Sequence, residues 1–216
     1  MTATPLRWRW PAASYVVLRC SRRIFASTGG NFAAALSEKT RLVILNTPHN
    51  PSATVWQRED FAALWQAIAE REIYVLSDEV YEHICFADGG HASVLAHPQL
   101  RERAVAVSSF GKTFHMTGWK VGYCVAPAAI SAELRKVHQY LTFSVNTPAQ
   151  LAIATCCAKR RSIIVSCRRF IGNVAICLLK RCAQAGWKSC PVKGPISCWR
   201  TTAPSPILTM SASAAG

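Results

Sequence analysis

Acidic residues are missing from both ends of this 216-residue chain. Residues 1–31 contain 5 Lys and Arg but no Asp or Glu, and residues 155–216 contain 10 Lys and Arg and again no acid. Residues 32–154 hold 10 basic and 11 acidic residues, so the net charge of +14 arises in the two flanks. Ordinary domains are about 25% charged with both signs mixed. The absence argues against an ordinary globular surface for either flank.

Metal-binding and membrane-spanning patterns are also missing. Seven cysteines lie beyond residue 155, but none forms a C-x-x-C pair and no histidine follows His138, so no metal site is predicted. The apolar segment 162–179 is interrupted by Arg168 and Arg169 and is too short to cross a bilayer. The N-terminus lacks the apolar core of a secretory signal. We therefore expect a cytoplasmic protein with reduced thiols and no membrane association.

The central part of the chain alternates apolar runs with amphipathic segments. The runs predict strands at 42–45, 73–76, 104–107 and 121–125. A helix is expected to end near 32–36, another to carry Phe61, Leu64, Trp65 and Ile68 on one face, and a third, marked by Leu134, Val137 and Leu141, to continue from Pro148 through Ile153. This order predicts an α/β fold with a mostly parallel sheet and flanking helices, and irregular flanks.

Polar side chains follow three of these predicted strands. Asn50 comes after the first, Asp78 and Tyr81 after the second, and Ser109 and Lys112 after the third. Ligands of open α/β sheets bind beyond the carboxyl ends of parallel strands, so we expect these side chains to share one pocket.

Lys112 is the residue with the most distinctive chemistry in this group. A lysine with a lowered pKa can form a Schiff base with a carbonyl, although a solvated loop lysine is the ordinary alternative. Asp78 and Ser109 could likewise be helix caps, and Asn50 a turn residue. Together they match what pyridoxal phosphate needs: an amine, a carboxylate for the ring nitrogen, donors to the ring oxygen and a phosphate cradle.

Four motifs carry a resemblance to a known family. They are N-P-S at 50–52, S-D-E-V-Y at 77–81, S-F-G-K at 109–112 and G-W-K-V-G at 118–122. They resemble the signatures of the class I/II aminotransferases of PLP fold type I, nearest to the group that includes methionine and kynurenine aminotransferases. The resemblance covers about residues 32–154 and implies a partial fold type I large domain.

The resemblance implies roles residue by residue. Lys112 would bind pyridoxal 5'-phosphate covalently and move a proton on the substrate, and Asp78 would pair with the pyridinium nitrogen. Asn50 and Tyr81 would bind the ring hydroxyl.

Two further residues would complete the cofactor site. Ser109 and Lys120 would bind the phosphate. Many relatives carry arginine in place of Lys120 and glycine in place of Ala53. The S-x-x-K spacing of 109–112 also occurs in penicillin-recognising enzymes, but their S-D-N and K-T-G partners are absent here.

Other parts of the family pattern cannot be placed. They are an upstream glycine-containing phosphate turn, an aromatic residue stacked on the cofactor and a C-terminal arginine for the substrate carboxylate. Relatives are homodimers, but several segments that build their interface are not in this chain. Under suitable codons, reading one base earlier from Thr155 and two bases on from Phe25 to Phe32 can restore acidic residues. We expect that the flanks 1–31 and 155–216 are translated out of frame.

The resemblance implies transamination between an amino acid, methionine or an aromatic one, and a 2-oxo acid. Little activity and weak cofactor binding are expected from a chain that lacks these parts. The alternative is a non-enzymatic basic protein that binds nucleic acid through its cationic flanks, with a strong dependence on salt. The basic residues of the tail do not line one helical face, so nucleic acid is not the favoured partner.

Overall fold

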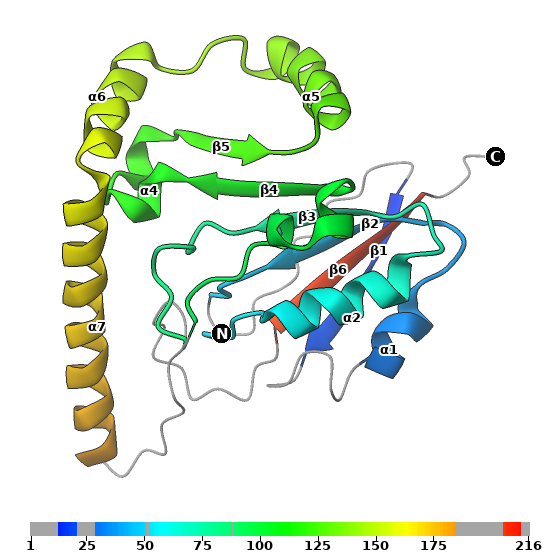
Figure 1. Ribbon diagram of the computed structural model, residues 1–216, viewed down its shortest axis with the longest axis horizontal. Helices are drawn as coiled ribbons and strands as arrows, with labels where there is room; N and C mark the ends of the chain where they lie inside the picture. The colour runs from blue at the N-terminus through cyan, green and yellow to red at the C-terminus, as the bar shows by residue number, and fades with distance from the viewer. Residues whose placement is uncertain (1–12, 21–28, 51, 88, 185–204, 213–216) are drawn as a thin grey trace.

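The computed structural model describes residues 13–20, 29–50, 52–87, 89–184 and 205–212. They form one mixed sheet with helices beside it (Figure 1). The strands are β1 (Ala13–Cys20), β2 (Thr40–Asn46), β3 (Tyr74–Asp78), β4 (Ala104–Ser109), β5 (Gly122–Val125) and β6 (Ser205–Ala212). The α-helices are α1 (Gly29–Ala35), α2 (Arg58–Ile68), α3 (Pro98–Arg101), α4 (Phe110–Thr113), α5 (Ala128–Leu141), α6 (Thr147–Ala158) and α7 (Arg160–Gln184), with short 3-10 turns η1 (Val94–Ala96) and η2 (Thr117–Trp119).

The strand order is β1-β6-β2-β3-β4-β5. Strands β2, β3 and β4 are parallel, and β5 returns antiparallel to β4. The predicted α/β fold is therefore confirmed, and its mostly parallel part is the four-stranded group β2 to β5. Strand β6 adds antiparallel to β2, and β1 adds antiparallel to β6.

The main core lies on one face of this sheet, under α1 and α2. The predicted apolar face of α2 is confirmed, because Phe61, Leu64 and Ile68 are buried. Burial alternates along β2, where Val43 and Leu45 are buried while their neighbours are half-buried, so the strand has a covered and a less covered face. The alternation determines which side chains of the strand face the core and which face the opposite side of the sheet.

Both flanks form regular structure where they are described, which corrects the expectation of irregular flanks. The N-terminal flank supplies β1, and the C-terminal flank supplies α7 and β6. Helix α7 runs beside the segment that follows β3: a Cβ added at Gly172 would lie 3.5 Å from Phe86 (Figure 1). Strands and helices are held by backbone hydrogen bonds, which do not depend on side-chain charge. A lack of acidic residues therefore does not prevent either from forming.

The helix predicted to run on through Ile153 is in fact two helices. Helix α5 ends at Leu141, and α6 starts with Pro148 in its first turn. The Asn146 side chain caps α6 by accepting a hydrogen bond from the Ala149 N–H at 2.9 Å. Proline is tolerated only in the first turn of a helix, because it lacks an N–H, and this explains the break.

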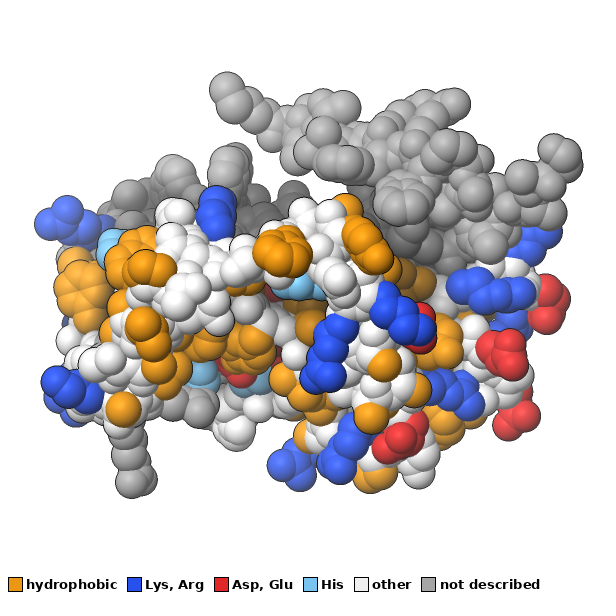
Figure 2. Space-filling model, turned by 90° about the horizontal axis from the view of Figure 1, so that it is seen from above, with side chains coloured by type: hydrophobic (Ala, Val, Ile, Leu, Met, Phe, Trp, Pro, Cys, Tyr) orange, Lys and Arg blue, Asp and Glu red, His pale blue; other side chains and the backbone are white. Residues whose placement is uncertain are grey.

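The predicted apolar residues of α5 are on the surface. Leu134 is 38% exposed, Val137 is 57% exposed and Leu141 is 80% exposed, and no residue of α5 is buried. Seen from the side of α5, β5 and α6, the surface carries several separate patches of apolar side chains (Figure 2). The periodicity of α5 therefore predicted its helix correctly, whereas the burial of its face is not seen.

Candidate active site

The carboxyl ends of β2, β3 and β4 lie side by side. Asn46 is opposite Asp78 in the β2–β3 pair, and Asp78 is opposite Val107 in the β3–β4 pair. The Asp78 carbonyl accepts hydrogen bonds from the Asn46 side-chain amide and from the Thr47 N–H, both at 2.9 Å. The backbone of Asp78 is thus fixed to the neighbouring strand at the point where the polar segments begin.

The Asp78 side chain sits in a half-buried position. Its Oδ1 accepts a hydrogen bond from the Val80 N–H at 3.2 Å. Burial raises the pKa of Asp78, the Val80 N–H opposes this, and the charge of Glu79 raises the pKa further. A partly desolvated carboxylate of this kind gains most from a proton-bearing nitrogen placed against it, which is what a pyridinium ring offers. The Asp78 carboxylate is thus a fitting acceptor for the ring nitrogen of the cofactor implied by the sequence.

Asn50 and Tyr81 are brought together across 31 residues. The Asn50 Nδ2 donates to the Tyr81 hydroxyl oxygen at 2.9 Å. The pair leaves the Tyr81 O–H proton free to donate to a third group. An amide and a phenol arranged in this way can bind one ligand oxygen between them, as the ring hydroxyl of the cofactor would require.

A hydrogen bond that involves a buried histidine stabilises the turn that carries Asn50. His49 is 5% exposed, its Nδ1 lies 2.7 Å from the Ser52 Oγ, and burial lowers the pKa of His49 to about 4. Within the same turn, Ala53 has a φ of 57°, in the left-handed region that favours glycine. The turn therefore uses an alanine where its backbone suits glycine.

Lys112 lies in the short helix α4, directly after β4. Its Nζ is 5.8 Å from the centroid of the Tyr81 ring. The turn around it is tight, because a Cβ at Gly111 would be 2.9 Å from the Cα of Thr117. The structure thus places the Lys112 amine over the ring whose hydroxyl is bound by Asn50.

Ser109 and Lys120 are less closely joined to the others. Ser109 ends β4 and pairs with Gly122 of β5, two residues after Lys120. Lys120 is exposed and has a φ of 54°. Within the described ranges, neither side chain forms a hydrogen bond or ion pair with the other predicted site residues. Their position at the same strand end is compatible with a phosphate, and their roles stay predictions.

Several polar residues beside this site were not singled out from the sequence. Glu82 accepts hydrogen bonds at Oε1 from Ser108 at 3.0 Å and from the Tyr123 hydroxyl. Glu79 is buried and hydrogen-bonded on both carboxylate oxygens. A carboxylate in a buried strand end has no sequence signal of its own, and only the fold shows its partners.

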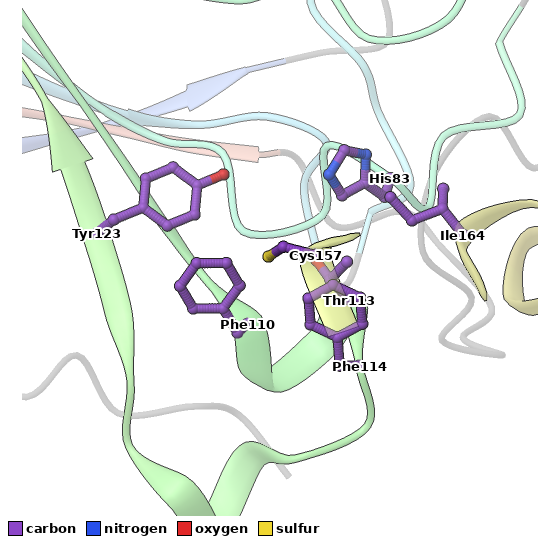
Figure 3. A pocket seen from close by; sticks show the side chains of 7 residues that line it. All are labelled: His83, Phe110, Thr113, Phe114, Tyr123, Cys157 and Ile164. Carbon is purple, nitrogen blue, oxygen red and sulfur yellow. The ribbon is translucent and has the colours of Figure 1, made fainter. Parts of the chain in front are cut away.

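A cavity of about 370 Å³ lies on another side of α4 (Figure 3). It is lined mainly by apolar side chains, with one imidazole and one thiol: His83, Phe110, Thr113, Phe114, Tyr123, Cys157 and Ile164. None of the six predicted site residues lines it. Phe110, Thr113 and Phe114 share one face of α4, and Lys112 is directed to Tyr81 instead. The cavity and the candidate cofactor site are therefore separate.

The described part of the chain shows neither a metal centre nor a membrane span. Over these residues, no three His, Cys, Asp or Glu side chains lie close enough to hold a metal ion. No described helix combines the length and apolar character needed to cross a membrane.

The mostly parallel sheet, with an acid at the end of β3 and a lysine directly after β4, is that of a fold type I aminotransferase domain. The chain matches the family model "Aminotransferase class I and II" over residues 23–215, and it belongs to that family. Members of this family depend on pyridoxal phosphate.

Within this family, the chain can be compared with individual proteins. The chain is 87% identical to methionine aminotransferase of Escherichia coli (strain K12) over 123 residues, which are 57% of this chain and 32% of the relative. It is 43% identical to kynurenine–oxoglutarate transaminase of Dictyostelium discoideum over 124 residues, 56% of this chain and 28% of the relative. The chain thus spans about a third of the length of these curated relatives.

Solved structures agree with this placement. YbdL from Escherichia coli, described with a methionine aminotransferase function, superposes with a TM-score of 0.74 and 67% identity over 77% of this chain and 44% of its own. N-succinyldiaminopimelate aminotransferase from Mycobacterium tuberculosis gives a TM-score of 0.73 and 28% identity over 77% and 43%. The resemblance and the fold class predicted from the sequence are confirmed.

Proposed function

We propose that the chain binds pyridoxal 5'-phosphate at the carboxyl ends of β2, β3 and β4. The observation that carries the proposal is the contact set in which the Lys112 amine lies 5.8 Å from the centroid of the Tyr81 ring, while the Tyr81 hydroxyl accepts from Asn50. Asp78 is the last residue of β3 and lies opposite Asn46 of β2. These four residues come from three strand ends and offer the groups that the cofactor requires.

The cofactor, when bound, supplies an aldehyde and a ring that accepts electrons from the substrate. Lys112 would hold it through Nζ and carry a proton there during the reaction. Asp78 would accept a hydrogen bond from the ring nitrogen and keep its proton in place. Asn50 and Tyr81 would orient the ring oxygen, and Ser109 with Lys120 would bind the phosphate.

The reaction that these residues support is transamination between an amino acid and a 2-oxo acid. Similarity to methionine aminotransferase and to kynurenine–oxoglutarate transaminase supports methionine or an aromatic amino acid as the donor. Because the chain spans about a third of these relatives, we propose that its own turnover is low.

We propose the same division of the chain as the sequence indicates: a partial cofactor-binding domain at 32–154 between two flanks of foreign reading frame. The segment that is 87% identical to the relative has 123 residues, which is also the length of 32–154. Composition supports the division, because residues 155–216 contain no Asp or Glu, whereas ordinary domains mix charges of both signs.

A cytoplasmic location with reduced thiols is part of the proposal. The five cysteines whose side chains are described are free thiols: Cys85, Cys124, Cys156, Cys157 and Cys177. Disulfides form and persist in oxidising compartments, so free thiols are in keeping with a reducing one.

Nucleic-acid binding by the flanks is the weaker candidate. Helix α7 exposes Arg168, Arg169, Lys180 and Arg181, but adjacent residues on a helix point about 100° apart, so these pairs do not form one basic face. Binding that falls steeply between low and moderate salt would favour this candidate, and salt-independent or absent binding to DNA would remove it.

The cofactor proposal is tested with the full chain and its Lys112→Ala variant. Each protein is incubated with pyridoxal phosphate, reduced with borohydride and digested, and the labelled peptide is identified by mass. We expect the label on Lys112, its loss in Lys112→Ala, and no change in the control Lys136→Ala, which removes an exposed lysine paired with Glu133. Equal labelling of all three proteins would contradict the proposal.

A further inference from the structure

Glu79 is a buried carboxylate whose two oxygens are both occupied. Its Oε1 accepts from the Ser77 hydroxyl and from the Val94 N–H, each at 2.9 Å, and its Oε2 lies 2.8 Å from the His91 Nε2. The side chains of Glu79 and His91 are 4% and 9% exposed. A carboxylate buried this deeply is stable only when its lone pairs are met by donors, and here three donors meet them.

The position of Glu79 couples this cluster to the candidate site. Side chains alternate along a strand, so Ser77 and Glu79 face the core and Asp78 faces the opposite side. The Glu79 N–H donates to the Val107 carbonyl of β4, and its carbonyl accepts from the Glu82 N–H, both at 2.8 Å. These bonds hold Glu79 to β4 and close a turn over residues 79–82, which contains Tyr81 and begins directly after Asp78.

His91 holds this arrangement from a distant point in the chain. The chain returns through Gly89 and Gly90, whose φ values of 82° and 77° suit glycine. A carboxylate oxygen only accepts, so the His91 Nε2 donates. The His91 Nδ1 is buried and has no hydrogen-bond partner among the described residues. His91 therefore contributes to this cluster through its Nε2 alone.

We propose that His91, acting through Glu79, is a positioning residue for cofactor binding: it holds the turn 78–81 so that Asp78 and Tyr81 reach the cofactor. The cofactor part of this inference rests on the proposed function. Without the His91 donor, the Glu79 Oε2 is buried with no donor, and the turn relaxes to admit water. Asp78 and Tyr81 then lose their common orientation, although neither touches His91.

The test uses His91→Leu, which keeps bulk but removes the donor, and His91→Gln, whose amide nitrogen can occupy the Nε2 position. The control is His138→Leu on the exposed surface of α5. Hydrogen exchange of the Val80 amide, which donates to Asp78, is measured without cofactor. The Kd for pyridoxal phosphate is measured by absorbance titration.

We expect His91→Leu to raise both the exchange rate and the Kd by about tenfold, the effect of losing a hydrogen bond to a charged group. His91→Gln should restore both, and the control should change neither. Unchanged exchange and Kd in His91→Leu would overturn the inference. If His91→Leu does not fold, His91→Asn replaces it, because its shorter amide does not reach Glu79, and equal values for the Asn and Gln variants would overturn the inference in the same way.

The two proposals fail differently. Cofactor affinity that is unaffected by Lys112→Ala would remove the proposed function, while the exchange of the Val80 amide still decides whether His91 positions the turn. Lys112-dependent binding with no response to His91→Leu would leave the proposed function intact and remove the positioning role.

Discussion

We expect His49 to lower the free energy of unfolding of the protein in mild acid. It is 5% exposed, and burial lowers its pKa from 6.5 to about 4. In the unfolded chain the imidazole takes up a proton as the pH falls below 6.5, whereas in the folded protein it does so only near pH 4. The stability that neutral His49 contributes is therefore complete above pH 6.5 and is lost as the pH falls towards 4.

The size of this loss follows from the pKa difference. Linkage gives about 2 kcal/mol at pH 5 and about 3 kcal/mol at pH 4, relative to neutral pH. Domains of this size have a free energy of unfolding of about 5–15 kcal/mol, so the loss is a large fraction of the total. The raised pKa of Asp78 acts in the opposite direction, since protonation then favours the folded state.

The assay compares the unsubstituted chain with His49→Asn. The Asn amide can keep the hydrogen bond to Ser52 that the His49 Nδ1 forms at 2.7 Å, but it does not titrate. Urea unfolding followed by circular dichroism at pH 7.5 and pH 5.0 gives the free energy of unfolding of each protein. Asp78 is present in both, so the difference isolates His49. The unsubstituted chain should lose about 2 kcal/mol more than the variant. Equal losses in the two proteins would refute the reasoning.

Two substitutions, each with a control variant, test the backbone around the site by the same unfolding assay. Gly122→Ala should cost about 1–3 kcal/mol, because its Cβ would lie 2.7 Å from the Ser108 carbonyl oxygen, whereas the control Gly118→Ala meets nothing within 4 Å and should change little. Equal effects of the two would count against the close approach of β5 to β4. Ala53→Gly should stabilise by about 1 kcal/mol, since its φ of 57° disfavours a Cβ, while Ala63→Gly inside α2 should destabilise by about the same amount. A loss of stability in Ala53→Gly would show that its backbone is not strained.

Strand positions could be predicted from the sequence because a run of four apolar residues with polar ends is typical of a buried strand. The runs at 42–45 and 104–107 lie inside β2 and β4, and the run at 73–76 overlaps β3. Their order in the sheet, with β6 inserted beside β2, could not be predicted, because pairing of a strand distant in the sequence depends on tertiary contacts. The break after Leu141 was also missed, although Pro148 marks it.

The candidate site, too, could be predicted only in part from the sequence. Asp78, Tyr81 and Lys112 could be proposed from the sequence because each follows an apolar run, and their residue types are chemically informative. The contact of His91 with Glu79 could not be proposed, since a histidine 12 residues after a glutamate has no periodic relation to it. Only the return of the chain through Gly89 and Gly90 brings the two together.

The order of the sheet has a consequence for handling this protein. Among the described residues, no strand pairs with the outer side of β5, whose four residues are all exposed. A free strand edge offers a row of backbone donors and acceptors to any other chain, and proteins usually block it with lysine, proline or a bulge. The sequence of β5, Gly-Tyr-Cys-Val, contains neither lysine nor proline. We therefore expect the chain to aggregate through this edge as its concentration rises.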